Sequence, residues 1–200
     1  GITDMLAHIM ERYFTNTPAT VVTDRLSEGL MQAIVEEARR VTLNSQNYDA
    51  RANLMWAGTL AHNGICGTGC EEDWASHFME HEVSAFYDVS HGAGLAVIFP
   101  AWLQWMAGHH AVKVAQWAER VWGVAPAGTP QATAEEGIRR FRTFLASIGM
   151  PLTFRELGIA DPDIPMLVDS LHRNKGELVG NYVRLTRRDT EEIYRLALGA

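Results

Sequence analysis

The sequence contains little cysteine and no long hydrophobic segment. Cys66 and Cys70 are the only cysteines among its 200 residues. Their separation of four residues differs from the spacing of zinc knuckles and thioredoxin-like motifs, so we expect small buried residues and not ligands. An N-terminal signal pattern and any apolar stretch of 18 or more residues are both missing. These absences favour a soluble protein of the reducing cytoplasm that has no membrane as a partner.

Positive charge and phosphate-binding motifs are also scarce. The net charge is −7, and no run of Lys or Arg exceeds two residues, which argues against nucleic acid as a partner. The sequence shows no G-x-G-x-x-G, no other glycine-rich phosphate loop and no alternation of strands and helices. We therefore expect no nucleotide-binding α/β domain within these 200 residues.

The apolar content is sufficient for one hydrophobic core. Hydrophobic residues make up 47% of the chain, which is typical of a single folded domain of this length. No convincing alternating pattern longer than five residues indicates a strand. The sequence thus predicts one all-α domain over residues 1–200, with eight or nine helices.

Periodic apolar residues predict where these helices lie. One helix is expected over 24–43 with Asp24 as its N-cap, and another over 73–87 with Asp73 in the same role. Further helices are expected over 48–63, 112–122 and 134–148 and after Pro165.

Three other segments carry specific expectations. Residues 95–106 are almost entirely apolar and predict a buried helix that kinks or begins again at Pro100. The Gly/Pro-rich turn 123–130 could separate two helical subdomains. Thr186, three residues before Asp189, predicts a capping box at the start of the last helix.

Asp4 and His8 are the first residues that could carry chemistry. They lie four positions apart in a helix-like segment, so both side chains project from one helix face. Such a pair can provide two ligands of one metal ion. A surface Asp–His pair is the simpler alternative, because the spacing by itself does not require a metal.

A histidine cluster in the segment 73–91 is the stronger signal. His77, Glu80 and His81 form the pattern H-x-x-E-H of inverted zinc proteases, in which two histidines bind the metal and the glutamate is a general base. His91 follows ten residues later. A helical zinc hydrolase, or a non-catalytic helical domain with structural histidines, would account for this segment as well.

The longer segment 80–96, EHEVSAFYDVSHGAGLA, resembles the iron-containing (group III) alcohol dehydrogenases. The resemblance extends over the whole chain. Within the family, the chain is most similar to the butanol-dehydrogenase-like, aldehyde-reducing branch. It rests on four groups of residues: Gly1, Asp4 and His8; Arg51, Asn53, Met55, Trp56 and Ala57; His77, His81 and His91; and the H-G-x-G residues His91, Gly92 and Gly94.

The resemblance implies the helical C-terminal domain of the dehydroquinate synthase-like, iron-containing alcohol dehydrogenase fold. It implies a divalent metal, Fe²⁺ or Zn²⁺, held by Asp4, His8, His77 and His91, and His81 as a cleft residue beside nicotinamide and substrate. Imidazole and carboxylate ligands suit either ion. Glu80 has no part in this interpretation.

The same resemblance implies the partners of the chain. The substrate would be a small alcohol or aldehyde, and NAD(P)H would be bound mainly by an N-terminal α/β domain outside this chain. The full-length enzyme would be a homodimer or higher homo-oligomer. The fragment alone would be inactive.

The remaining histidines and the tryptophans predict structural roles. His62, His109, His110 and His172 have no partner at ligand spacing and are expected in the core or on the surface. The six tryptophans fall at helical spacing and are expected in the core.

Overall fold

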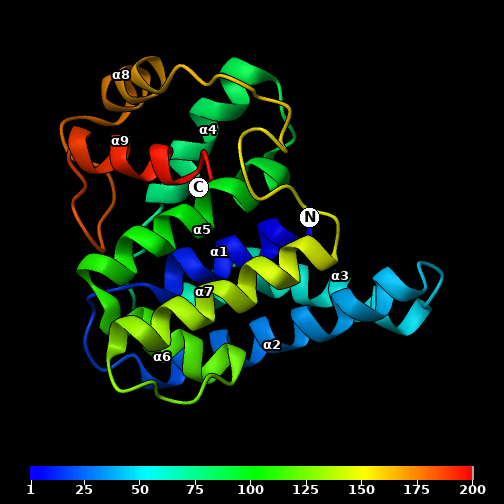
Figure 1. Cartoon of the computed structure of the whole chain (residues 1–200). Helices are drawn as coiled ribbons and strands as arrows, with labels where there is room; N and C mark the ends of the chain where they lie inside the picture. The colour runs from blue at the N-terminus through cyan, green and yellow to red at the C-terminus, as the bar shows by residue number, and fades with distance from the viewer. Residues whose placement is uncertain (200) are drawn as a thin grey trace.

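Helices make up almost all regular structure of residues 1–199, the part of the chain that the computed structural model describes (Figure 1). The described residues contain nine α-helices, a short 3-10 helix, η1, and no strand, with one isolated bridge between Val179 and Leu185. The all-α prediction and its helix count are confirmed. In chain order the elements are α1 (Ile2–Tyr13), α2 (Val21–Leu43), α3 (Tyr48–His62), η1 (Ile65–Gly67), α4 (Ala75–Tyr87), α5 (His91–His109), α6 (Ala111–Trp122), α7 (Pro130–Ser147), α8 (Ile164–Lys175) and α9 (Arg187–Leu196).

Helix α5 is the centre of the molecule. It packs against α1, α4, α6, α7 and α9, and its residues from Gly94 to Leu103 are all buried. A helix that is apolar on every side can only be stable when other helices surround it. The hydrophobic core around α5 is continuous and includes the fully buried Trp102 and Trp117.

Pro100 interrupts neither this helix nor the core. Helix α5 runs from His91 through Pro100 to His109 as one element, so the predicted restart at the proline is wrong, and so is the predicted beginning at residue 95. The cost of the missing backbone hydrogen bond at a proline is outweighed where neighbouring helices fix the segment by packing.

Two predicted N-caps have other functions in the structure. Helix α2 begins at Val21, and Asp24 lies in its first turn, where its carboxylate accepts hydrogen bonds from Lys113 and Gln116 of α6. Helix α4 begins at Ala75 after Trp74, whereas Asp73 accepts the backbone N–H groups of residues 181 and 182. Asp24 also accepts from Thr20 Oγ1, and Asp73 from the N–H of Ala75, the first residue of α4. Neither aspartate is the N-cap residue itself, and both add tertiary contacts to their contacts at the helix start. The capping box of Thr186 and Asp189 is confirmed.

The turn 123–130 joins two helices that pack directly against each other. A Cβ atom on Gly137 of α7 would lie 2.3 Å from the Cβ of Ala118 in α6, so the two helices approach closely. Because one core extends across both helices, the turn is a hairpin connection and does not separate subdomains.

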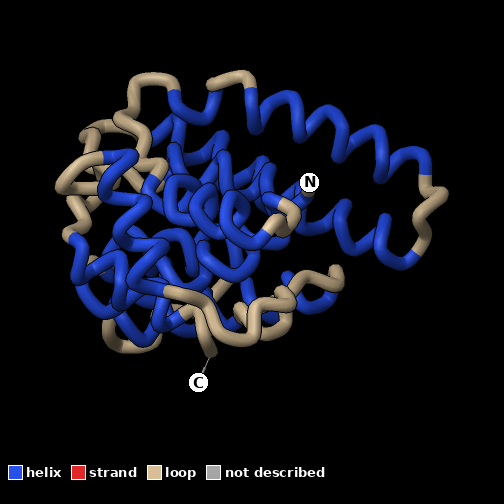
Figure 2. Tube along the Cα trace, turned by 90° about the horizontal axis from the view of Figure 1, so that it is seen from above, coloured by secondary structure: helices blue, strands red, loops and turns tan. Residues whose placement is uncertain are grey.

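Two further sequence expectations concern exposure. Trp56 on α3 is 63% exposed, so the prediction that all tryptophans lie in the core is wrong for this residue. It lies on the α2–α3 hairpin, which extends away from the other helices (Figure 2).

Cys66 is buried and Cys70 half-buried, both as free thiols. Among the described residues, no helix has the length and apolar composition needed to span a membrane.

Candidate metal centre

The carboxylate of Asp4 lies at the centre of a histidine cluster formed by three helices. Its Oδ1 atom is 3.3 Å from His91 Nε2, 3.6 Å from His8 Nε2 and 3.8 Å from His77 Nε2. Asp4 and His8 lie on α1, while His77 is in the first turn of α4 and His91 is the first residue of α5. The structure therefore brings together the four residues that the sequence analysis selected.

Two carboxylates fix the rings of His77 and His91. Glu11 Oε1 accepts a hydrogen bond from His77 Nδ1 at 2.8 Å, and Glu80 accepts one from His91 Nδ1. An ionised carboxylate only accepts hydrogen bonds, so the proton of each neutral ring lies on Nδ1. The lone pairs on both Nε2 atoms then point towards Asp4. Carboxylates that orient histidines in this way are typical of metal centres.

Two buried atoms in the cluster lack hydrogen-bond partners. Among the described residues, neither Asp4 Oδ1 nor His77 Nε2 has one. Buried polar atoms without a partner are uncommon, because removing them from water costs about 1–3 kcal/mol. A cation between the Nε2 lone pairs and the carboxylate would satisfy both atoms. The donor set, imidazole nitrogen and carboxylate oxygen, suits Fe²⁺ or Zn²⁺.

The charges of the cluster also favour a cation. Burial works against ionisation of Asp4, but the neighbouring His77 and His8 outweigh it and hold the pKa of Asp4 below its usual range. Burial and the nearby His77 lower the pKa of His8 to about 4. Burial also acts to lower the pKa of His77, but hydrogen bonds and charges from Asp4 and Glu11 outweigh this effect and raise the pKa to about 9. At neutral pH Asp4 is thus ionised and His8 neutral, which are the states that bind metal, whereas His77 carries a second proton that it must release when an ion binds.

His81 lies beside this cluster, one turn after His77 on α4. Its ring centroid is 5.3 Å from that of His91 and 6.2 Å from that of His77, and the residue is exposed. Burial of part of the ring, together with His91 and His77, lowers the pKa of His81. The side chain therefore faces solvent at the edge of the cluster.

The position of Glu80 bears on the hydrolase alternative. The residue is fully buried, and its two carboxylate oxygens accept hydrogen bonds from Ser84 Oγ and His91 Nδ1. Glu80, His81 and His91 have potential ligand atoms within 4.8 Å of one another. However, both oxygens of Glu80 already accept hydrogen bonds, so this carboxylate is not free to activate water as a general base. The hydrolase alternative is not supported, and the expectation that Glu80 has no part in the site is corrected.

Sequence reasoning missed Glu11 and Trp74 as parts of the site. Glu11 is 1% exposed and accepts hydrogen bonds from Trp74 N, Ser76 Oγ and His77 N as well as from the ring of His77. Its spacing from Asp4 and His8 places it on the same face of α1, which could have identified it. Trp74 has a left-handed backbone conformation, with φ of 67°, and its ring lies 4.9 Å from that of His77 and 5.1 Å from that of His8.

His62 was also missed. It was expected in the core or on the surface without a partner, but its Nε2 atom lies 3.3 Å from Asp4 Oδ2. His109 is exposed and stacks on Trp105, and His172 is buried between Gly176 O and Thr190 Oγ1, as expected. Because His62 and Asp4 are 58 residues apart in the sequence, no local spacing could have predicted their contact.

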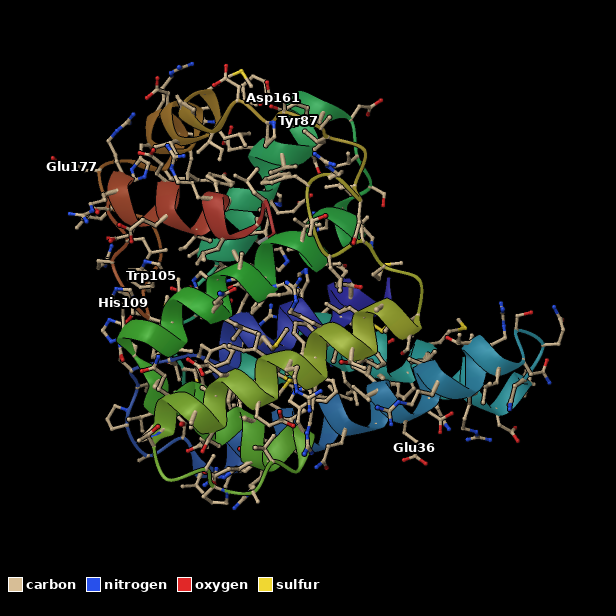
Figure 3. The ribbon with its side chains drawn as sticks, in the orientation of Figure 1. Glu36, Tyr87, Trp105, His109, Asp161 and Glu177 are labelled. Carbon is tan, nitrogen blue, oxygen red and sulfur yellow. The ribbon has the colours of Figure 1, made fainter. Side chains whose placement is uncertain are left out.

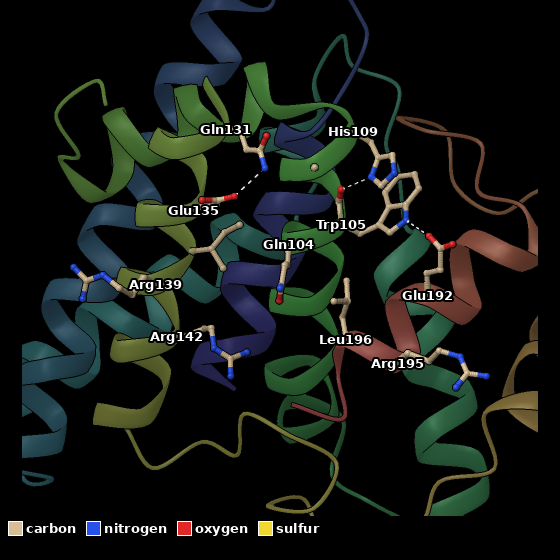
Figure 4. A pocket seen from close by; sticks show the side chains of 12 residues that line it. Gln104, Trp105, His109, Gln131, Glu135, Arg139, Arg142, Glu192, Arg195 and Leu196 are labelled. Carbon is tan, nitrogen blue, oxygen red and sulfur yellow. Dashed lines mark hydrogen bonds between the residues drawn. The ribbon is translucent and has the colours of Figure 1, made fainter. Parts of the chain in front are cut away.

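A cavity of about 730 Å³ lies elsewhere, between α5, α7 and α9 (Figure 4). Trp105 and His109, which line it, lie together at the end of α5 that is farthest from His91 (Figure 3). None of the cluster residues lines this cavity. The cavity is therefore separate from the cluster.

Known proteins are similar to this chain in sequence and fold. The family model described as "Fe-containing alcohol dehydrogenase family, C-terminal" matches residues 1–198. The chain is 32% identical to NADH-dependent butanol dehydrogenase A of Clostridium acetobutylicum, over 98% of this chain and 50% of that protein. It is 31% identical to the NADPH-dependent aldehyde reductase YqhD of Escherichia coli, over 98% of this chain and 51% of that protein.

Solved structures agree with these matches. The substrate- and cofactor-free form of aldehyde reductase YqhD from E. coli superimposes with a TM-score of 0.91 at 31% identity, covering 98% of this chain and 51% of that one. For NADH-dependent butanol dehydrogenase A from Thermotoga maritima the TM-score is 0.90 at 33% identity, with 98% and 51% covered. The chain thus spans about half the length of the relatives it matches.

Proposed function

The chain belongs to the iron-containing alcohol dehydrogenase family, and on that premise we propose that it is the metal-binding half of an NAD(P)H-dependent alcohol dehydrogenase or aldehyde reductase. Residues 1–200 would form its helical domain, and a nucleotide-binding α/β domain would lie outside this chain. We further propose small alcohols or aldehydes as substrates, a homo-oligomeric full-length enzyme and a cytoplasmic location.

The proposal rests above all on the arrangement around Asp4. Three imidazole Nε2 atoms lie within 3.8 Å of one carboxylate oxygen, and that oxygen is buried without a hydrogen-bond partner in the described residues. We assign Asp4, His8, His77 and His91 as the ligands of a divalent metal, Fe²⁺ or Zn²⁺. When bound, the ion would supply Lewis-acid polarisation of a carbonyl or alkoxide oxygen for hydride transfer.

The protein groups around the ligands keep them in a binding state. Glu11 and Glu80 hold the Nδ1–H groups of His77 and His91, which leaves both Nε2 atoms available. Trp74 covers the cluster on the side of His8 and His77, where it limits the access of water. The exposed edge at His81 remains for substrate.

We propose His81 as the residue that contacts nicotinamide and substrate. It is exposed next to His91, outside the group of atoms that surrounds Asp4. In the full-length enzyme, His81→Ala should lower turnover and leave the metal content nearly unchanged. Loss of metal as complete as in His91→Ala would make His81 a ligand and refute this assignment.

Elemental analysis of the purified chain tests the metal proposal directly. After anaerobic incubation with Fe²⁺ or Zn²⁺ and removal of free ions, we expect about one ion per chain. Asp4→Asn and His91→Ala should lose that ion, whereas His109→Ala, which changes a distant exposed histidine, should keep it. Equal metal content in all four proteins would refute the proposed centre.

A further inference from the structure

His62 extends the histidine cluster beyond the four proposed ligands. It is the last residue of α3, and its side chain is 39% exposed. Its ring centroid lies 4.2 Å from that of His8, and its Nε2 atom lies 3.3 Å from Asp4 Oδ2. His62 thus approaches the oxygen of Asp4 that the other three imidazoles leave free.

The other ring nitrogen of His62 determines its tautomer. Nδ1 lies 2.7 Å from the carbonyl oxygen of Gly58, one turn earlier in α3. A carbonyl oxygen only accepts hydrogen bonds, so Nδ1 carries the proton of the neutral ring and Nε2 presents its lone pair to the Asp4 carboxylate. A neutral ring in this tautomer cannot donate to Asp4, so either a second proton or a metal ion must lie between Nε2 and Oδ2. The same arrangement exists at His77 and His91, where the acceptors of the Nδ1 proton are Glu11 and Glu80.

The distance from His62 to Asp4 matches that of the proposed ligands. Ligands about 2.0–2.2 Å from a shared ion lie roughly 3–3.6 Å from their neighbours in the shell. His62 Nε2 lies 3.3 Å from Asp4 Oδ2, and His91 Nε2 lies 3.3 Å from Asp4 Oδ1. The Nε2 atoms of His8 and His77 lie farther from Oδ1, at 3.6 and 3.8 Å. A carboxylate can bind a metal through both oxygens, so an ion held by Asp4 can reach the side on which His62 lies.

The backbone of α3 is built for this close approach. A Cβ atom on Gly58 would lie 3.0 Å from Cε of Met5, the neighbour of Asp4 on α1. The glycine therefore lets α3 pack closely on α1 one turn before His62. His62 thus lies at the end of a helix that packs on α1, which carries Asp4 and His8.

We propose that His62 Nε2 is an additional ligand of the metal ion held by Asp4, His8, His77 and His91. The inference rests on the proposed metal centre and adds a fifth protein residue to it. Because His62 is the most exposed of the imidazoles around Asp4, it occupies the edge of the shell that faces solvent.

His109 provides a matched control. It is also exposed near the end of a helix, and its Nδ1 atom contacts the carbonyl oxygen of Trp105 one turn earlier, at 2.8 Å. Its ring stacks on Trp105, at the end of α5 that is farthest from His91. Both histidines thus direct Nδ1 to a carbonyl oxygen one turn earlier, but only His62 has its Nε2 atom beside Asp4.

Cobalt binding distinguishes a ligand from a neighbour. Co²⁺ takes the same nitrogen and oxygen ligands as Fe²⁺ and Zn²⁺, and its visible bands report the ligand field. We would titrate the purified chain, His62→Ala, His62→Gln and His109→Ala with Co²⁺, after checking by circular dichroism that all four have equal helix content. We expect both His62 variants to bind Co²⁺ at least about tenfold more weakly, with bands at lower energy because an oxygen donor replaces a nitrogen. Added imidazole should restore the band positions in His62→Ala, while His109→Ala should match the unchanged chain.

The outcomes separate this inference from the proposed function. If the unchanged chain binds no Co²⁺, the metal centre and the role of His62 both fail. If it binds Co²⁺ and the His62 variants have the same affinity and spectrum, only the role of His62 is refuted. A weaker affinity with unchanged bands would make His62 a positioning residue for Asp4 and would also overturn its assignment as a ligand.

Discussion

At the scale of single residues, the two nitrogens of each cluster imidazole have different partners. The Nδ1 atoms of His77 and His91 contact Glu11 and Glu80, and their Nε2 atoms face Asp4. The carboxylates fix the orientation of the two rings. The site therefore depends on acidic residues that do not face Asp4 themselves.

Replacement of Glu11 tests this dependence. The buried carboxylate of Glu11 accepts four hydrogen bonds. In Glu11→Gln an amide NH2 group, which cannot accept, replaces one of its oxygens, so His77 loses its fixed orientation. We expect the affinity for Zn²⁺ to fall by about 10–100-fold, measured by competition with a chromogenic chelator.

The control for Glu11 is a buried glutamate outside the cluster. Glu37 is 9% exposed and pairs with Arg40 on α2. Glu37→Gln should leave Zn²⁺ affinity unchanged. If both variants lower the affinity equally, the effect is one of general stability and not of His77.

Gly94 is required by the position of Glu80. A Cβ atom on Gly94 would lie 2.1 Å from Glu80 Oε1, so Gly94→Ala must displace the carboxylate that holds His91. We expect a loss of about 1–3 kcal/mol in the free energy of unfolding together with weaker Zn²⁺ binding, measured by urea denaturation and by metal titration.

Gly108 on the same helix serves as the comparison. A Cβ atom there would meet nothing within 4 Å, so Gly108→Ala should raise stability by about 0.5–1 kcal/mol through helix propensity. An equal gain in Gly94→Ala would contradict the proposed role of Gly94.

At the scale of elements, the beginnings of α4 and α5 are fixed by contacts that are distant in sequence. Helix α4 follows Trp74 in a strained left-handed conformation, and Glu11 of α1 accepts the N–H groups of residues 74 and 77. Asp73 holds the turn at residues 181 and 182 against the same helix start. These carboxylates connect α1, α4 and the segment before α9.

Asp73 makes the stability of this connection depend on pH. Burial, and secondarily the charge of Glu11, raise the pKa of Asp73 from 3.8 to about 7. Because the folded protein then binds this proton more tightly than the unfolded chain, the free energy of unfolding contributed by Asp73 falls as the pH rises from about 4 to about 7. The slope should be on the order of 1 kcal/mol per pH unit.

Asp73→Asn should remove this slope and keep the turn, since its amide oxygen can still accept both backbone N–H groups. Urea denaturation between pH 4.5 and 7.5, about the window of the Asp73 titration, measures the effect. Asp161→Asn, which changes an exposed loop residue (Figure 3), should keep the slope of the unchanged chain. A slope that persists in Asp73→Asn would assign the pH dependence to other groups.

At the scale of the whole molecule, the chain contains the proposed metal centre but only about half the length of its relatives. Hydride transfer requires nicotinamide and carbonyl carbon to be held in near-attack geometry. We therefore expect no oxidation of NADH or NADPH when the chain is mixed with Zn²⁺ or Fe²⁺ and butanal, as followed by absorbance. Rates comparable to those of a full-length family member would show that the nucleotide site lies within this chain.

The sequence alone determined the local features of this protein. The apolar periodicity predicted most helices, and the spacings of Asp4 and His8 and of His77 and His81 placed each pair on one helix face, because these features depend on residues less than two turns apart. The resemblance to the family then selected Asp4 and the three histidines that the structure places around it.

Only the tertiary structure decided which residues complete the cluster. Glu11 reaches His77 from α1, Glu80 binds His91 across the α4–α5 junction, and His62 contacts Asp4 from the end of α3. It also decided that α5 continues through Pro100, and that Asp24 and Asp73 bind partners on other elements. Spacing along one helix cannot predict these contacts, because they depend on how closely separate helices pack and on which buried polar groups need a partner.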